Sequence, residues 1–537
     1  MIKKFTKISA LDIIFIIQLL VVGLVITGIL PRSIMPYFVV VLIIYALTAR
    51  LDDTAVFFVR SIPLFIAIPI TTSYDSFNTW RILSVIIFLR WAFQKNIFRL
   101  IIDNSKMLIK SPRRFIKENK FTSMGLVLFL LALISIPQSQ GHIIALKRLF
   151  YFINLSLIGF VIYGLMGEGK DLGERLIKNL AVPVIIVTTV GFIQLAMTYF
   201  VDIYQFVDIW GKGIECRLFG EGWCYIVVHV GNTWFSYFGN QLSLRMFSLF
   251  PDSHSFPIFL LLGLPSIFAL SLTRVIKSNN SLKSMMKTRA SLLVVFVPLI
   301  FLAAILSGTR GIWAASLGGV LAIIAVIILL VRQKQDQRKI NIFKYSAGYI
   351  ILFFILFGLA YPIMASPQFL LSKDNSLLLE NRIESILDFG ETSNSQRITI
   401  WKASIRSIIK HPLIGVGIGN FPVVLGQDLS LSRAGSSAHN LYLNIVAEMG
   451  ILAIIISLLF LWLLIKKAYT DFISSGDPIP TIYYGTALIF IPWVLFYSLT
   501  DVAIFDERAF LLFVVTISLI LGVRNNSSPH SERICGK

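Results

Sequence analysis

The chain has 537 residues, of which 56% are hydrophobic and only 14% are charged, and its mean hydropathy is +0.81. Soluble domains carry about 25% charged residues, so this composition excludes an ordinary soluble domain and predicts an all-α polytopic membrane protein. The formal net charge of +20 does not indicate nucleic-acid binding, because the basic residues lie mostly in short loops between apolar segments.

Apolar segments near the length of a membrane-spanning helix recur from one end of the chain to the other. The first follows several lysines, as a signal sequence does, but it is long enough to span and no small-residue cleavage site follows it. We therefore expect about 14 transmembrane helices, with a range of roughly 12–14. In chain order they cover residues 11–30, 34–49, 55–71, 80–93, 121–137, 143–165, 179–200, 254–273, 290–306, 312–331, 345–364, 440–465, 481–499 and 509–523.

Loops rich in Lys and Arg test this arrangement. They are residues 95–120, 170–178, 274–289, 332–344 and 466–467, and the fourteen-helix arrangement places all of them on one side together with both termini. By the positive-inside rule that side is cytoplasmic. Three other segments then lie outside.

We divide the chain into three regions, which together contain the three external segments. Residues 1–289 form N-terminal transmembrane helices with an external loop at 201–253. Residues 290–465 contain the short turn that bears Arg310 and a long external loop at 365–438. Residues 466–537 form the C-terminal helices and a cytoplasmic tail.

The chain has three cysteines, and none has metal-ligand spacing. Cys216 and Cys224 share the external loop at 201–253, where an oxidising compartment would allow a disulfide between them. We keep this pair as a possible disulfide, because connectivity cannot be deduced from sequence alone.

Arg310 lies in a tight turn, Ser-Gly-Thr-Arg-Gly, between two long apolar segments. An arginine is costly in hydrocarbon and usually faces a cavity, a partner or water. Its planar guanidinium matches phosphate oxygens, and at the start of a helix the unpaired backbone N–H groups add to the attraction for an anion.

The long external loop is expected to contain an amphipathic helix. Ser393, Asn394 and Ser395 are N-cap residue types, and the apolar residues at 398, 401, 405, 408 and 409 recur at helical spacing. We expect this helix to lie on the membrane surface and to end before Pro412. Arg397 in its first turn is a second candidate for binding phosphate.

His439 is the candidate general base. We expect it at the start of a helix capped by Ser436 or Ser437, where the helix dipole disfavours imidazolium, and a neutral imidazole near pH 7 can accept a proton. Asn440, Asn444 and Glu448 follow on one helix face. Glu448 is expected within the bilayer, where it needs a partner such as a basic residue of a neighbouring helix.

Arg245 is a third external arginine, just before the span that starts near residue 254. Two arginines outside the membrane suit a diphosphate carried on a lipid, and Arg245 would add to them.

Each residue also has a simpler interpretation. Arg310 could extend to lipid headgroups, and Arg397 could be one of several solvated basic residues on an amphipathic face. His439 could serve as an interfacial or capping residue. Arg245 could be an ordinary loop residue, and Glu448 could form a structural ion pair.

At these residues the chain resembles the O-antigen ligase/polymerase family of bacterial membrane glycosyltransferases. The resemblance covers roughly residues 290–465 and includes S-G-T-R-G-x-W, R-x-x-x-W followed by H-P-L-x-G-x-G-x-G-N-F, and H-N-x-Y-L…A-E-x-G. The chain differs from ligases in its higher predicted helix count and in the cysteine-bearing loop.

The resemblance implies a fold of the metal-independent, multi-helical membrane glycosyltransferase type without a cofactor. It implies a bacterial inner-membrane protein whose active site is extracytoplasmic. The donor would be a glycan linked to undecaprenyl diphosphate, and the acceptor either a lipid A core sugar or a second lipid-linked glycan. Arg310 and Arg397 match arginines that hold the diphosphate, and His439 matches a histidine that activates the acceptor hydroxyl.

Two other classes compete with an enzyme. A transporter or flippase of lipid-linked glycans would also need arginines for the diphosphate, but its charges would be spread through the spans rather than gathered at one face. Mid-span charges are few in this chain, which favours the enzyme. A structural membrane protein would not explain two arginines and a histidine that all fall outside.

Overall fold

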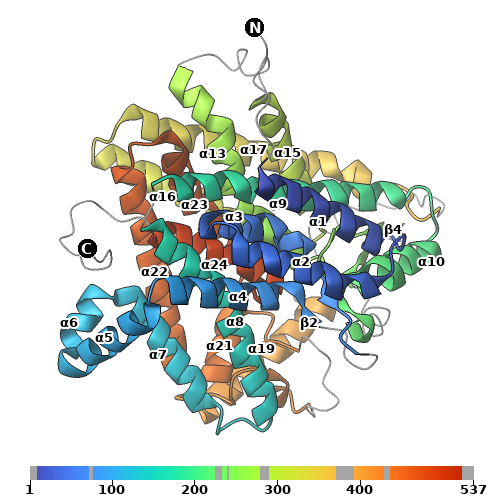
Figure 1. Ribbon diagram of the computed structural model, residues 1–537. Helices are drawn as coiled ribbons and strands as arrows, with labels where there is room; N and C mark the ends of the chain where they lie inside the picture. Colours follow the sequence, from blue (N-terminus) through green and yellow to red (C-terminus); the bar gives the residue numbers. More distant parts are fainter. Residues whose placement is uncertain are drawn as a thin grey trace.

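The computed structural model describes residues 9–71, 77–167, 170–223, 233–238, 241–278, 290–370, 392–427 and 436–522. These residues are mostly helical (Figure 1). The first part of the chain forms α1 (Ala10–Ile26), η1 (Arg32–Ile34), α2 (Met35–Thr48), α3 (Leu51–Ser61), η2 (Ile62–Leu64), β1 (Ala67–Ile68), β2 (Phe77–Asn78), α4 (Thr79–Gln94), α5 (Ile97–Lys110), α6 (Pro112–Glu118), α7 (Lys120–Ser135), α8 (His142–Met166) and α9 (Lys170–Met197).

The external loop that follows forms α10 (Ile203–Phe206), the π-helical segment η3 (Val207–Glu215), α11 (Cys216–Phe219), β3 (Phe235–Phe238) and β4 (Gln241–Leu244). The remaining elements are α13 (Ser255–Ser278), α15 (Ala290–Leu306), α16 (Arg310–Arg332), α17 (Gln337–Met364), α19 (Thr392–Lys410), α20 (Phe421–Val424), α21 (Leu441–Met449), α22 (Ile451–Ser474), α23 (Pro478–Tyr497), η5 (Ala503–Phe505) and α24 (Glu507–Leu521). Each strand pair is antiparallel, with Ala67 opposite Asn78 and Phe235 opposite Leu244.

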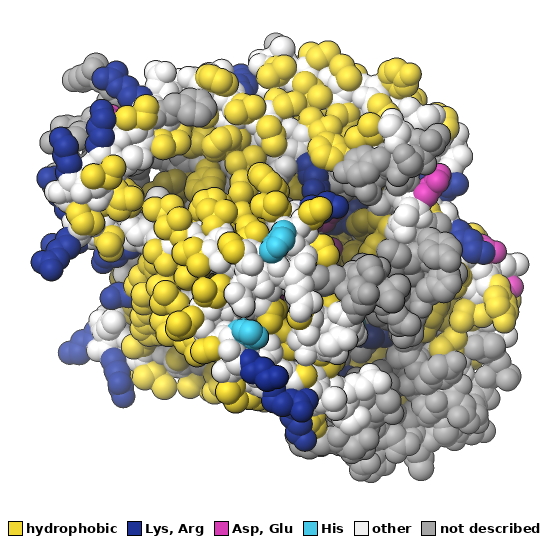
Figure 2. Space-filling view, turned by 90° about the horizontal axis from the view of Figure 1, so that it is seen from below, with side chains coloured by type: hydrophobic (Ala, Val, Ile, Leu, Met, Phe, Trp, Pro, Cys, Tyr) yellow, Lys and Arg dark blue, Asp and Glu magenta, His cyan; other side chains and the backbone are white. Residues whose placement is uncertain are grey.

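The helices confirm a polytopic helical membrane protein. Within the described part of the chain, seven helices are long and apolar enough to cross a membrane, namely α8, α9, α13, α16, α17, α22 and α23, and the bent pair α6–α7 would make eight. Figure 2 shows apolar side chains across the middle of one face and Lys and Arg side chains along its left edge. That edge lies on the same side as α5 and α6 in Figure 1, away from α10 and β4.

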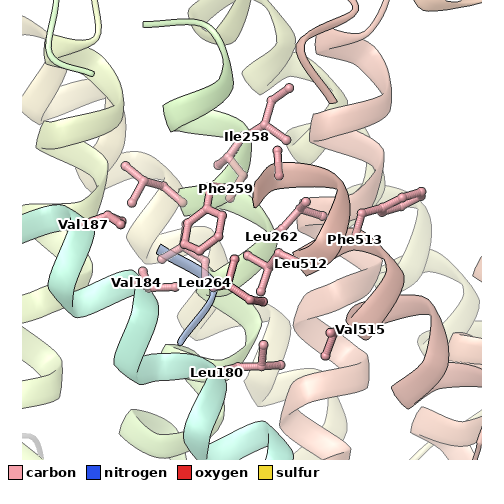
Figure 3. Close-up of a cluster of buried hydrophobic side chains, with 14 of the residues drawn as sticks. Leu180, Val184, Val187, Ile258, Phe259, Leu262, Leu264, Leu512, Phe513 and Val515 are labelled. Atoms are coloured by element: carbon pink, nitrogen blue, oxygen red, sulfur yellow. The ribbon is translucent and has the colours of Figure 1, made fainter. Parts of the chain in front are cut away.

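The core is built around α13. The apolar window of α13 is 89% buried and that of α23 is 72% buried, whereas that of α22 is 17% buried, so α13 and α23 are central and α22 is peripheral. α13 packs against α9, α15, α23 and α24. Figure 3 shows part of this packing, with side chains such as Leu180, Phe259 and Leu512 meeting from three helices. All three predicted regions therefore share one core.

Gly263 permits the close approach of α13 to α9, because a Cβ atom at this position would overlap the side chain of Val184. We expect Gly263→Ala to destabilise the protein by about 1–3 kcal/mol, through overpacking of a dense core. The matched control is Gly23→Ala in α1, where the added Cβ meets nothing within 4 Å. Thermal unfolding of the purified variants in detergent measures this difference, and equal melting temperatures for Gly263→Ala and the parent protein would contradict it.

Two of the predicted spans are not single continuous helices in the structure. The segment at 55–71 does not continue as a helix, because α3 ends at Ser61, η2 contains Pro63, and Ala67 and Ile68 pair with β2. Proline lacks the N–H that a helix interior needs. The segment at 440–465 is divided at Gly450 (φ +84°), where the backbone of Leu413 comes too close for any Cβ. Hydropathy alone detects neither interruption.

Candidate functional site

The turn that carries Arg310 is held by two distant segments. Thr309 occupies the N-cap position of α16, and its hydroxyl donates to the carbonyl of Ser253 at 2.9 Å instead of accepting from the helix. Gly311 packs against Tyr497 and Thr500 at the end of α23, leaving no room for a Cβ. Arg310, the first residue of α16, therefore begins its helix between the segment before α13 and the end of α23.

Arg245 binds the same turn. Its Nε donates to the carbonyl of Ser307 at 3.3 Å and its Nη2 to the hydroxyl of Thr309 at 3.3 Å. Gly308 has φ +63°, and a Cβ there would lie 3.0 Å from Cγ of Arg245. The structure thus joins the Arg245 segment to the Arg310 turn, although 65 residues separate the two arginines in the sequence.

His254 connects Arg245 to an aspartate. Nη2 of Arg245 lies 3.2 Å from Nε2 of His254, and because arginine has no acceptor, Nε2 must accept this hydrogen bond. The same Nε2 is 3.9 Å from Oδ2 of Asp501, and Nδ1 is 3.8 Å from Oδ1 of Asp252. Burial lowers the pKa of His254, and Arg245 lowers it further, so the imidazole is neutral near pH 7.

Asp501 lies between two histidines. Its Oδ2 is 3.9 Å from Nε2 of His254 and 3.9 Å from Nδ1 of His439. Its Oδ1 accepts backbone N–H groups of Val502 and Ala503. Burial raises the pKa of Asp501, but both histidines and Arg397 outweigh that effect and hold the pKa below its ordinary value. The site therefore contains a buried, ionised carboxylate.

His439 precedes α21 in an unusual backbone conformation. Its φ is +46°, in the left-handed region that non-glycine residues rarely adopt. Its Nδ1 is buried and has no hydrogen-bond partner, whereas the side chain as a whole is 41% exposed. The ring therefore directs Nδ1 toward Asp501 and leaves its other edge accessible.

The cap of α21 differs from the prediction. Asn440 is the N-cap, with its side chain accepting from the N–H of Leu443 at 3.0 Å, whereas Ser437 accepts from the N–H of His439. Ser436 and Ser437 are therefore not the caps, because the chain enters the helix only at Leu441. The amide oxygen of Asn444 accepts from the N–H of Ala438, so both asparagines position the segment around His439.

Arg397 approaches the site on α19. One helical turn further on, Nε1 of Trp401 donates to the carbonyl of Ala438 at 3.0 Å, which fixes this helix beside His439. The charge of Arg397 acts on both His254 and Asp501. The predicted helix is therefore present, but residues 393–395 lie within it and do not cap it. Its residues Ile400 and Ile408 pack on Phe421, Ala438 and Ala447.

Glu448 lies in α21, just before α22. The charge of Arg148 from α8 acts on its carboxylate, as do the backbone of Gly419 and Phe421 and the amide of Asn444. Arg148 is thus a basic residue of a neighbouring helix, which is the kind of partner that the sequence predicts.

The remaining candidates concern cysteine and metal ions. Cys216 is disulfide-bonded, but Cys224 lies outside the described residues, so their pairing stays a prediction. Where the structure describes the chain, no group of three or more His, Cys, Asp or Glu side chains is arranged to hold a metal ion.

His254 and Asp501 are the residues that sequence reasoning missed. His254 forms no ligand spacing with the other histidines, and Asp501 belongs to no motif. One signal was present for both: each is a polar residue at the end of an apolar segment, on the side predicted to be external. A search for such residues would have found them.

Comparison with protein-family models gives a match over part of the chain. Residues 293–458 match the family model described as O-antigen ligase. No curated protein matches the chain. The matched region contains Arg310, Arg397 and His439, whereas Arg245, His254 and Asp501 lie outside it. Over residues 293–458 the chain is thus similar to O-antigen ligases, which supports its resemblance to the O-antigen ligase/polymerase family.

Proposed function

We propose that this protein transfers a glycan from undecaprenyl diphosphate to an acceptor hydroxyl at the extracytoplasmic face of the bacterial inner membrane. The family match supports a membrane glycan ligase or polymerase. One observation supports the proposed donor and mechanism. Arg245, His254, Asp501 and His439 come from separate segments of the chain and form a continuous series of contacts.

The two other arginines complete the proposed diphosphate site. Arg310 begins the helix that Arg245 helps to hold, and Arg397 acts electrostatically on the same carboxylate that neighbours His439. Both termini would then be cytoplasmic, and the helix count of about 14 belongs to this proposed topology.

The reaction needs a base and a stabilised leaving group. His439 removes the proton from the acceptor hydroxyl, whose oxygen attacks the anomeric carbon as the bond from that carbon to the diphosphate oxygen breaks. The attack comes from the face opposite the leaving group, so the configuration inverts. The diphosphate departs with an added negative charge, which Arg310 and Arg397, with Arg245, stabilise. The proton remains on His439 until solvent removes it.

Asp501 and His254 would position these groups. A carboxylate near one ring nitrogen of His439 favours the tautomer that leaves the other nitrogen free to accept a proton, and it stabilises the imidazolium that forms. Neutral His254 accepts from Arg245 and therefore fixes that guanidinium beside the Arg310 turn.

Asp501→Asn tests this positioning role. We expect the rate of transfer to fall by roughly 100-fold or more, because the amide neither stabilises imidazolium nor favours the productive tautomer. Donor affinity should not fall, because the substitution removes a negative charge from a site that binds an anion. Parallel loss of donor binding and transfer would instead indicate a purely structural role. Single-turnover rates and equilibrium donor binding of the purified variant separate the two results.

Labelled undecaprenyl diphosphate glycan distinguishes this proposal from a transporter. The purified protein in detergent should form a new glycosidic bond to an added acceptor. A protein that only moves the labelled lipid across vesicles, and forms no bond in detergent, would be a transporter or flippase. The acceptor that reacts, either a lipid A core or a second lipid-linked glycan, would separate ligase from polymerase.

A further inference from the structure

A second pair of arginines lies beside the candidate site and is not used by the proposed mechanism. Arg81 stands in the first turn of α4, and Arg148 stands near the start of α8. Both guanidiniums contact the ring of Tyr151, at 5.6 Å for Arg81 and 5.3 Å for Arg148. Each is half-buried.

Aromatic rings cover the flat faces of both guanidiniums. Arg81 also lies 5.1 Å from the ring of Trp80, and Arg148 lies 4.9 Å from the ring of Phe152 and 5.4 Å from that of Phe505. Such stacking occupies the face of a guanidinium and leaves the N–H groups at its edge available for an anion.

In the described part of the chain neither guanidinium is in direct contact with a group of opposite charge, although the charge of Arg148 acts on the carboxylate of Glu448. Among the residues that the structure describes, no carboxylate forms an ion pair with Arg81 or Arg148, and neither side chain donates a hydrogen bond. Nε of Arg81 is buried and unpaired. Buried donors are nearly always satisfied, so an unpaired guanidinium nitrogen points to a ligand that completes the site.

Nearby carboxylates are already engaged elsewhere. Glu507 accepts from Nε1 of Trp80 and from the amide of Asn78, both at 2.7 Å. Asp506 accepts the backbone N–H groups of Arg508 and Ala509 at the start of α24. Glu448, which senses the charge of Arg148, is the third acid near this pair. Within the described residues, none of the three forms an ion pair or a hydrogen bond with the Arg81 or Arg148 side chain.

The pair borders the candidate site along η5. Asp501 lies two residues before the start of this segment and Phe505 ends it, so the two Cα atoms are at most about 14 Å apart. The hydroxyl of Tyr151 donates to the carbonyl of Phe505 at 2.9 Å, which ties the pair to η5. Arg148 also packs on Gly419, in the loop that connects the helix of Arg397 to the segment of His439.

We infer that Arg81 and Arg148 bind an anionic group of the acceptor, a phosphate or carboxylate, while the donor diphosphate occupies the arginines near His439. The inference rests on the proposed function for the identity of the acceptor, but the anion site rests on the unpaired guanidiniums alone. Two sources could supply the anion: the diphosphate of a second lipid-linked glycan, or a charged sugar of a lipid A core.

Equilibrium binding to the purified protein in detergent tests the site without requiring turnover. Farnesyl diphosphate serves as the lipid diphosphate probe, and a hexose monophosphate serves as the charged-sugar probe. If the acceptor is lipid-linked, the parent protein should bind two equivalents of farnesyl diphosphate. If the acceptor is a charged glycan, it should bind one equivalent of each probe.

The double variant Arg81→Gln/Arg148→Gln should lose the second binding event, with affinity reduced at least tenfold, and should retain the first. Arg397→Gln should show the reverse. The matched control is Lys147→Gln, which removes an exposed cation next to Arg148 and should leave both events intact. In the transfer assay the double variant should raise the KM for the acceptor at least tenfold while the donor KM and kcat stay unchanged.

Several results would overturn the inference. The double variant could retain both binding events, or lose both equally while its melting temperature is unchanged. If the double variant does not fold, Arg81→Lys/Arg148→Lys replaces it, because this variant keeps both positive charges. The site would also be refuted if the second binding event were weakened equally in this variant and in Lys147→Gln. Loss of binding in Arg81→Gln/Arg148→Gln but not in Arg397→Gln would support the second site and contradict the proposed donor site.

Discussion

Replacing His439 with alanine should abolish the polymer or the ligated glycan in cells while the protein remains in the membrane. A positioned general base contributes roughly 10²–10⁴-fold to the rate of such a reaction. Loss of the ring removes a side chain that is already 41% exposed, so the fold should tolerate the change. Glycan electrophoresis and immunodetection of the protein in membrane fractions measure both quantities.

His411→Ala provides the control for this variant, because His411 is exposed and immediately follows α19. It should leave glycan synthesis unchanged. Normal glycan in the His439→Ala strain would refute the role of His439 as the base, and equal losses in both variants would indicate a general effect on the fold.

Arg310→Ala and Arg397→Ala should each lower the rate of transfer by roughly 100- to 1,000-fold, because each removes one fixed positive charge from the departing diphosphate. Arg→Lys at either position should restore only part of the rate, since an ammonium cannot make the paired contacts of a guanidinium. Initial rates with labelled donor in detergent measure these effects.

Arg406 supplies the comparison within the same helix. It is an exposed arginine of α19, so Arg406→Ala removes an equal charge from the amphipathic face without touching the site. Its rate should stay close to that of the parent protein. If Arg397→Ala and Arg406→Ala lose activity equally, then Arg397 is simply one of several solvated basic residues on that face.

Much of the local structure could be predicted from the sequence. Most of the apolar segments, the amphipathic helix around Trp401 and the helix start at Arg310 follow from residue spacing, and helices occupy these positions in the structure. Such features depend on neighbouring residues, so a single sequence contains the necessary information.

Contacts between distant segments could not be predicted in this way. Asp501 acquires its significance only because the end of α23 brings it within 3.9 Å of both His254 and His439. The same holds for Arg245, whose partners Ser307 and Thr309 belong to another helix turn. No local pattern encodes these pairs.

Hydropathy also failed to separate buried helices from lipid-facing ones. α13 is largely enclosed by other helices, and α24 is a short helix whose side chains are mostly buried. In the sequence, however, the hydropathy of both segments does not distinguish them from lipid-facing helices. The interruptions at Ser61 and Gly450 arise from proline and from close backbone packing, which a hydropathy window averages away.

Cysteine cross-linking from outside the cell tests the central claim, that Arg397 and His439 meet in one pocket facing away from the cytoplasm. In Arg397→Cys/His439→Cys, a short bifunctional thiol reagent that cannot cross the membrane should link the two positions in intact spheroplasts. The control pair Lys110→Cys/His439→Cys, with Lys110 in a loop predicted to be cytoplasmic, should not react. Absence of the first link, or its formation only after permeabilisation, would contradict the account.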